Sequence, residues 1–132
     1  MSAQLKKLLY TAEAVVEGGR QGHGRTSDGR LEVDLSIPVA LGGDDGPGTN
    51  PEELFAVGFA ACFQSALLGV ARGRNLDTSG SRITSRLGIG PRDDGGFGLE
   101  VSLDSGPTSA ARTRTTRGNI AVLLSVDGKP AR

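Results

Sequence analysis

Hydrophobic and polar residues alternate in three segments of the chain, and each segment predicts a half-buried strand. Apolar side chains occupy every second position in residues 31–37, 83–89 and 97–103, with Arg30 preceding the first of these runs. In an extended strand this period places apolar residues on one face and polar residues on the other. Asp28-Gly29 and Asp93-Asp94-Gly95-Gly96 stand immediately before strands and are typical of hairpin turns. The strands at residues 31–37 and 97–103, which follow these turns, are therefore expected to pair with the segments before them.

Two further strands are predicted from weaker patterns. Residues 8–16 are rich in apolar and β-compatible side chains, and residues 119–126 form the last apolar segment. Four glycines in residues 18–24 mark a flexible turn after the first of these strands. Residues 104–116 are polar and have no apolar period, so we expect a loop there.

A long helix is predicted from about Pro51 to about Arg72. Asn50 is able to cap its first turn, and Pro51 suits the first helical position. Glu52 and Glu53 follow, and their negative charges are favoured at the positive end of the helix dipole. Strands on either side of one long helix indicate an α+β fold.

The middle of this helix raises the question of a membrane. Residues 54–71 carry no formal charge and reach the lower length limit for a membrane-spanning helix. Glycines, alanines, Gln64 and Ser65 make the segment only weakly hydrophobic, and neither Trp nor Tyr flanks it. We therefore expect the buried central helix of a soluble protein.

Composition narrows the function classes. The 132 residues fit one domain, residues 1–132, and 15 basic residues balance 15 acidic ones. A chain without net charge lacks the positive field that attracts nucleic acid or anionic membranes, so we expect neither partner. One Cys and one His exclude a disulfide framework and zinc sites of the usual Cys and His ligands. The lone Cys and the absence of a signal-peptide pattern predict a cytoplasmic protein. We also expect neither a metal nor a cofactor.

The single cysteine, Cys62, lies midway along the predicted helix. Its helical neighbours are Gly58, Phe59, Ser65 and Ala66, three of which are small enough for another chain segment to approach. Two interpretations stay open on the residues alone. Cys62 is either a small buried hydrophobe, as free cysteines commonly are, or a reactive thiolate that needs access and a nearby positive charge.

Several short segments stand in one order along the chain: residues 9–12 (LYTA), 18–20 (GGR), 41–43 (LGG), 48–56 (GTNPEELFA), 58–63 (GFAACF), 88–91 (GIGP), 95–101 (GGFGLEV) and 116–120 (TRGNI). Each motif is weak alone, but together they are specific. The chain resembles the organic hydroperoxide resistance (Ohr) family, a branch of the osmotically inducible protein C (OsmC) superfamily. The resemblance covers most of residues 8–103 and the last predicted strand.

The resemblance implies a thiol-dependent peroxidase, an oxidoreductase that reduces alkyl or fatty-acid hydroperoxides to alcohols in defence against oxidative stress. It implies antiparallel sheets packed on a long central helix in an intertwined homodimer, with sites at the interface. Cys62 matches the peroxidatic cysteine, Arg20 the arginine that holds it as a thiolate, and Glu52 the carboxylate that orients the arginine. The implied partners are the hydroperoxide, a thiol or lipoyl-type dithiol reductant and a second copy of the chain.

The spacing of two of these residues constrains the site. Glu52 and Cys62 are ten residues apart, which is about 15 Å of axial rise on one straight helix. One arginine side chain does not easily reach both. Either the helix breaks, for example at Gly58, or the Glu52 and Cys62 of one site come from different chains.

The chain departs from the family pattern after about residue 103. Family members usually carry a second helix there and then a Cys-Pro-Tyr motif that supplies a resolving cysteine. Here Ala110 and Ala111 fall near the Cys-Pro position, and the chain holds no second Cys. Three outcomes stay open: resolution of Cys62 by an external thiol, over-oxidation after a few turnovers, or a non-catalytic, redox-sensing or binding scaffold.

Overall fold

The structure, a computed structural model, describes residues 5–106, 110–116 and 119–125, with side chains described up to Asp104. Its internal contacts divide the chain into two compact units, residues 1–51 and 52–132. The description of residues 1–132 as one domain stays a prediction.

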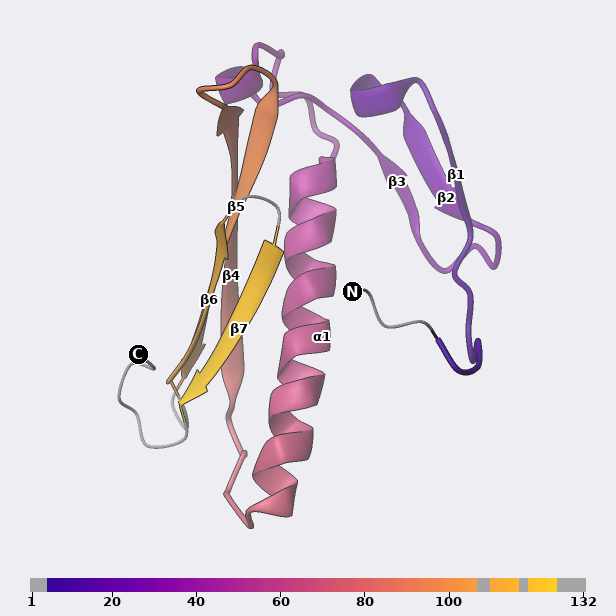
Figure 1. The fold of residues 1–132 in the computed structure, drawn as a ribbon. Coiled ribbons are helices and arrows are strands. Elements are labelled where there is room, and N and C mark those ends of the chain that lie inside the picture. The colour runs from indigo at the N-terminus through magenta and orange to yellow at the C-terminus, as the bar shows by residue number, and fades with distance from the viewer. Residues whose placement is uncertain (1–4, 107–109, 117–118, 126–132) are drawn as a thin grey trace. The chain divides into compact units, whose positions relative to one another are not determined.

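The first unit is built on a three-stranded antiparallel sheet in the order β1 (Ala14–Glu17), β2 (His23–Thr26) and β3 (Glu32–Asp34), labelled in Figure 1. The hairpin predicted at Asp28-Gly29 is confirmed. Gly29 has a φ of +72°, which glycine adopts without strain, and its amide donates to the carbonyl of Thr26 at 2.9 Å.

The strand predicted for residues 8–16 is wrong over most of its length, because only residues from Ala14 onward pair with β2. A strand needs a neighbour for its backbone groups, and within the described chain residues 8–13 are not in a sheet. The strand that was expected up to residue 37 is likewise shortened to β3. Leu35 beyond it forms an isolated parallel bridge with Thr49 instead.

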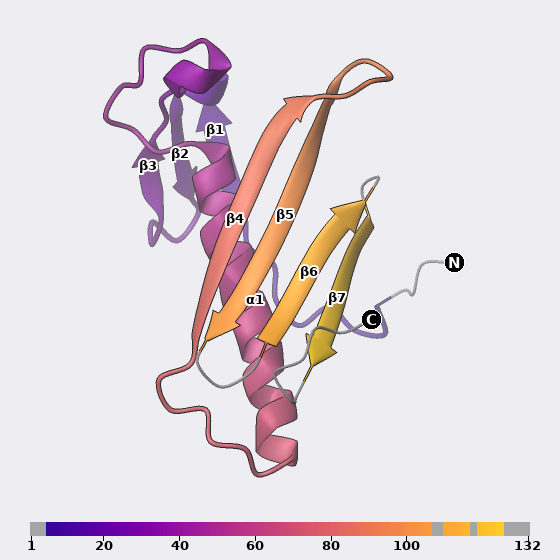
Figure 2. The same ribbon diagram turned by 90° about the vertical axis from the view of Figure 1, so that its left-hand side faces the viewer.

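The second unit places the helix α1 (Pro51–Gly73) along one face of a four-stranded antiparallel sheet (Figure 1). The strands are β4 (Arg82–Pro91), β5 (Phe97–Gly106), β6 (Ala110–Thr116) and β7 (Asn119–Ser125), side by side in this order in Figure 2. The helix and the hairpin between β4 and β5 are confirmed. Gly95 and Gly96 in the hairpin turn have φ values of +90° and +76°.

The loop predicted for residues 104–116 is wrong. β5 continues to Gly106, and residues 110–116 form β6, which pairs with β7 along its whole length. Three threonines among the seven residues of β6 favour extended backbone, and pairing with neighbours on both sides requires no apolar alternation. A strand thus occupies much of the segment that was expected to be a loop.

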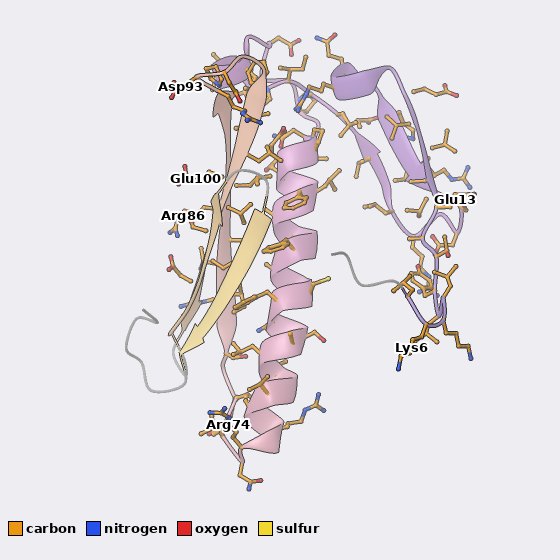
Figure 3. The ribbon with its side chains drawn as sticks, in the orientation of Figure 1. Lys6, Glu13, Arg74, Arg86, Asp93 and Glu100 are labelled. Carbon is orange, nitrogen blue, oxygen red and sulfur yellow. The ribbon has the colours of Figure 1, made fainter. Side chains whose placement is uncertain are left out.

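Among the side chains that the structure describes, the core of the second unit lies between α1 and the sheet. Phe63 of α1 and Leu103 of β5 form a buried cluster, against which Phe59, Ala60 and Ile83 pack. Leu103 is completely buried. On the other side of the sheet, away from α1, Figure 3 shows the side chains of Arg86 and Glu100. Among the described side chains, this cluster is therefore partly aromatic, because Phe63 and Phe59 belong to it.

One polar side-chain atom is buried in this unit without a hydrogen-bond partner among the described residues. The hydroxyl oxygen of Ser85 on β4, opposite Leu103 in the register, is buried and has no hydrogen-bond partner among the described residues. Ser85→Ala is therefore expected to raise the free energy of unfolding by about 1 kcal/mol, because it removes an unsatisfied buried oxygen. Urea denaturation measures this, with Ser102→Ala at an exposed position of β5 as the control. A loss of stability in Ser85→Ala would contradict the expectation.

Helix α1 is less covered than predicted. Among its residues only Phe63, Leu67 and Ala71 are buried, and Val57 on another face is 72% exposed. By length and composition the helix is apolar enough to cross a membrane, with a mean hydropathy of 1.9. The core helix of a soluble protein has the same length and composition, so hydropathy alone does not separate the two cases. In a single chain, therefore, one apolar face of α1 is exposed.

Candidate functional site

Cys62 is exposed in the structure, on the face of α1 that the sheet does not cover. Its exposed helical neighbours include Gly58, Ser65 and Ala66, whose small side chains leave the sulfur open to approach. The interpretation of Cys62 as a buried core residue is therefore wrong for this chain. An accessible thiol meets one of the two requirements for reactivity, and the other is a positive partner.

Arg20 lies in a glycine turn of the first unit, on the short 3-10 helix η1 (Gly19–Gln21). Gly18 and Gly19 before it have φ values of +82° and +59°, where other residues are strained. A Cβ added at Gly22 would lie 1.7 Å from the carbonyl oxygen of Glu17, so only glycine fits there. The glycines around Arg20 thus allow a tight turn that other residues could not adopt without strain.

Backbone hydrogen bonds connect the base of this turn to the segment that enters α1. The amide of Leu35 donates to the carbonyl of Gly22 at 2.8 Å, and the amide of Thr49 donates to the carbonyl of Asp34 at 2.9 Å. The amide of Ser36 donates in turn to the carbonyl of Thr49 at 2.8 Å. The end of β3 therefore holds both the base of the arginine turn and residue 49.

Glu52 follows Thr49 by three residues and stands in the first turn of α1. It is half-buried, in contrast to the exposed Glu53 beside it. The hydrogen bonds at residues 34–36 thus link the segment that carries Arg20 with the segment that leads to Glu52. This link was not visible in the sequence, where the two residues are 32 positions apart.

The helix between Glu52 and Cys62 is continuous. Gly58 lies inside α1, so the predicted alternative of a helix break at this residue is wrong. Glu52 and Cys62 of one chain are therefore separated by about 15 Å along the axis. Of the two alternatives from the sequence, the one in which Glu52 and Cys62 of a site come from different chains stays a prediction.

Two pockets in the described residues lie elsewhere. One of about 330 Å³ is at the end of the β4–β5 hairpin, near Arg92, and one of about 390 Å³ is bordered by Tyr10 and Ser27. Neither includes Cys62, Arg20 or Glu52. Among the residues that the structure describes, no group of three His, Cys, Asp or Glu side chains is placed to hold a metal ion.

Sequence reasoning missed one arrangement of charged residues. His23, which follows the arginine turn, makes side-chain hydrogen bonds to Asp34 and to Glu32. The signal available in the sequence was the pair of acidic residues two positions apart on the neighbouring strand. Only the register of β2 on β3 brings them to the histidine.

No family model matches the chain, but the known proteins to which it is similar include several organic hydroperoxide resistance proteins. It is 41% identical over 141 aligned positions to the organic hydroperoxide resistance protein of Xanthomonas axonopodis pv. citri, covering 94% of this chain and 99% of that protein. It is 35% identical to the organic hydroperoxide resistance protein OhrB of Bacillus subtilis, covering 89% and 98% respectively.

Solved structures agree with these relatives. The crystal structure of an organic hydroperoxide resistance protein from Legionella pneumophila matches with a TM-score of 0.69 at 44% identity, over 75% of this chain and 72% of that one. The predicted α+β fold is confirmed by this match. With near-complete coverage of curated relatives and a shared fold, the chain belongs to the organic hydroperoxide resistance family within the OsmC superfamily.

Proposed function

We propose that the protein is a cysteine-based peroxidase that reduces alkyl or fatty-acid hydroperoxides to alcohols and so protects against oxidative stress. The observation that carries the proposal is an exposed thiol, Cys62, midway along α1 in a chain of the organic hydroperoxide resistance family. The names of the relatives support a role in hydroperoxide resistance. The reaction at sulfur and the roles of the residues are our inference.

The proposed reaction begins with the thiolate of Cys62. The sulfur attacks the terminal oxygen of the hydroperoxide, the O–O bond breaks, and the alkoxide leaves and takes up a proton to become the alcohol. The cysteine is oxidised to a sulfenic acid, and the peroxide is reduced by two electrons. The sulfur must be ionised for this step, because the thiol form is a poor nucleophile.

Arg20 is proposed to hold the thiolate and to donate hydrogen bonds to the peroxide oxygens. A guanidinium suits this role because it keeps its proton and presents several N–H donors in one plane. Glu52 is proposed to grip the guanidinium and fix its plane, as a carboxylate does in a bidentate pair. The hydrogen bonds that link the arginine turn to residue 49 support this pairing.

The proposed working unit is a homodimer with two sites, each using Cys62 of one chain and Arg20 with Glu52 of the other. The unbroken helix between Glu52 and Cys62 supports this, because one arginine does not easily bridge 15 Å (about ten helical residues). The apolar face of α1 that one chain leaves exposed also supports it. A dimer that covers this face is consistent with a soluble, cytoplasmic protein.

Regeneration of the thiol must use a reductant from outside the chain. Cys62 is the only cysteine in the sequence, so its sulfenic acid has no second thiol in the same chain with which to form a disulfide. We propose a one-cysteine cycle in which an external thiol or dithiol attacks the sulfenic acid. Water leaves, and the reductant forms a mixed disulfide with Cys62. A second such thiol then frees Cys62 by disulfide exchange.

The lone cysteine also favours a second candidate function, a redox-sensing or binding scaffold that does not turn over. Steady-state consumption of tert-butyl hydroperoxide, measured first with dihydrolipoamide and then with a monothiol, separates the two. Sustained turnover with either reductant supports the peroxidase. A single stoichiometric burst supports the sensor, and no reaction in the folded protein supports the scaffold.

The role of Arg20 predicts a change in the reactivity of the thiol. In Arg20→Ala the rate of alkylation of Cys62 by iodoacetamide at pH 7 is expected to fall by about tenfold or more, because the thiolate is the nucleophile and an adjacent positive charge favours it. Arg30→Ala is the matched control, since Arg30 lies in the same unit and its side chain is 90% exposed. Equal alkylation rates in both variants would contradict the role of Arg20.

A further inference from the structure

The imidazole of His23 lies between two carboxylates on the polar face of the three-stranded sheet. Its Nδ1 is 2.8 Å from Oδ1 of Asp34, and its Nε2 is 3.0 Å from Oε2 of Glu32. Asp34 is the register partner of His23 on β3, and Glu32 lies two residues away on the same face. From β1, Glu17 is the other register partner, and Arg25 is on the same face of β2 itself.

Both ring nitrogens therefore face an acceptor. An ionised carboxylate only accepts hydrogen bonds, so each nitrogen needs a proton of its own to bond its partner. The imidazolium form satisfies both contacts. Neutral imidazole has one N–H and one lone pair, and the lone pair would face a carboxylate oxygen, so one of the two contacts must open.

His23 lies next to the turn that carries Arg20, so its contacts act at the base of that turn. His23 directly follows Gly22, whose amide donates to the carbonyl of Gly19 and closes the turn that carries Arg20. The carbonyl of Gly22 accepts from the amide of Leu35, just beyond β3. The imidazole bridge and this backbone bond therefore join the same two segments at the base of the arginine turn.

We propose that His23 is a proton-operated latch that fastens the base of the Arg20 turn to β3. With the imidazolium form, both carboxylates are bonded and the base of the turn is held. When the ring loses a proton, one bond opens and the base of the turn loosens. The latch does not depend on the peroxidase reaction; only an effect on Cys62 through Arg20 would rest on the proposed function.

The direction of the pH dependence follows from the contacts. Hydrogen bonds to Asp34 and then to Glu32 raise the pKa of His23 above its usual 6.5. The stabilisation is therefore complete below pH 6.5 and is lost as the pH rises through the higher pKa of the folded state. The latch is closed at mildly acidic pH, where the ring is protonated and carboxylates are ionised, and it opens toward alkaline pH.

The titration is measurable without ambiguity because His23 is the only histidine in the chain. In the proton NMR titration of the full-length protein, we expect a midpoint above 6.5 that falls toward 6.5 in Asp34→Asn and in Glu32→Gln. Glu17→Gln is the matched control, because Glu17 shares the face without a described hydrogen bond to the ring, and a smaller shift is expected. A wild-type midpoint at or below 6.5, or one that neither Asp34→Asn nor Glu32→Gln lowers, overturns the proposal.

Hydrogen exchange at the amide of Leu35 tests whether the ring holds the turn. After correction for the intrinsic pH dependence of exchange, protection is expected to be about two- to fivefold greater below the His23 midpoint than above it, the scale of an exposed ion pair. In His23→Gln this pH dependence should vanish. Protection that is independent of pH in the wild type overturns the latch. Neither readout involves the thiol, so failure of the peroxidase proposal would leave both results unchanged.

Discussion

Replacement of Cys62 by serine is expected to abolish consumption of organic hydroperoxide by the protein. A serine hydroxyl is not ionised near neutral pH, and no other residue of the chain is a thiol. The rate with tert-butyl hydroperoxide and dihydrolipoamide should therefore fall to that of the reagents without protein. The consumption of peroxide over time, measured at equal protein concentrations, gives the result directly.

Ser65→Ala is the control for this substitution. Ser65 lies one turn from Cys62 on the exposed side of α1, so its replacement tests the same region of the helix without touching the sulfur. We expect the rate of Ser65→Ala to be close to that of the wild type. Measurable turnover by Cys62→Ser above the blank would show that the reaction does not pass through this thiol.

The same variant distinguishes a site within one chain from a site between two chains. Arg20→Ala and Cys62→Ser are each expected to be impaired, but a mixed dimer of the two would keep one intact site if Arg20 acts on the partner's cysteine. Random exchange of subunits makes half of the dimers mixed, so about a quarter of the wild-type activity should return. A mixture as inactive as its components would place Arg20 and Cys62 of a site in one chain.

The elements that the sequence predicts well are those specified by local signals. α1 has a proline at its first position, acidic residues in its first turn and no internal charge over residues 54–71. The β4–β5 hairpin has strict alternation and two glycines in its turn. In both cases the residues that determine the element are neighbours in the chain, so a periodic pattern is sufficient.

β6 was missed because its specification is not local. Its residues, AARTRTT, have no apolar period, and they become a strand through pairing with β5 on one side and β7 on the other. Residues 8–13 show the converse error, since an apolar segment was expected to be a strand but is not in a sheet of the described chain. Pairing with other segments of the sheet decided both cases, and no pattern within one segment reports it.

In the candidate site, too, the features that depend on neighbouring residues were predictable, and those that depend on strand pairing were not. The glycines around Arg20 and the position of Glu52 in the first helical turn are local features, and the structure agrees with both. That Arg20, Glu52 and Cys62 act together came only from the family resemblance and is still a prediction. The bridge from His23 to Asp34 and Glu32 depends on strand register, which is why His23 did not stand out before the pairing of β2 with β3 was known.

The largest expected loss of stability comes from Leu103→Ala. Leu103 is fully buried against Phe63, with few other buried side chains among the described residues, so truncation removes apolar contacts and leaves a cavity. Such substitutions destabilise proteins by about 2–5 kcal/mol. Because whole domains are stable by only about 5–15 kcal/mol, this change is expected to bring the protein close to unfolding at room temperature.

Leu99→Ala is the matched control on the same strand and face of β5. Leu99 is 50% exposed, so its truncation loses less buried surface and is expected to destabilise by about 1 kcal/mol or less. Urea denaturation at one fixed protomer concentration gives both values, since association would otherwise contribute to the apparent stability. Similar losses for the two leucines would mean that the packing of α1 on β5 does not centre on Leu103, whereas a loss several times greater for Leu103 would identify its contact with Phe63 as the centre of the core.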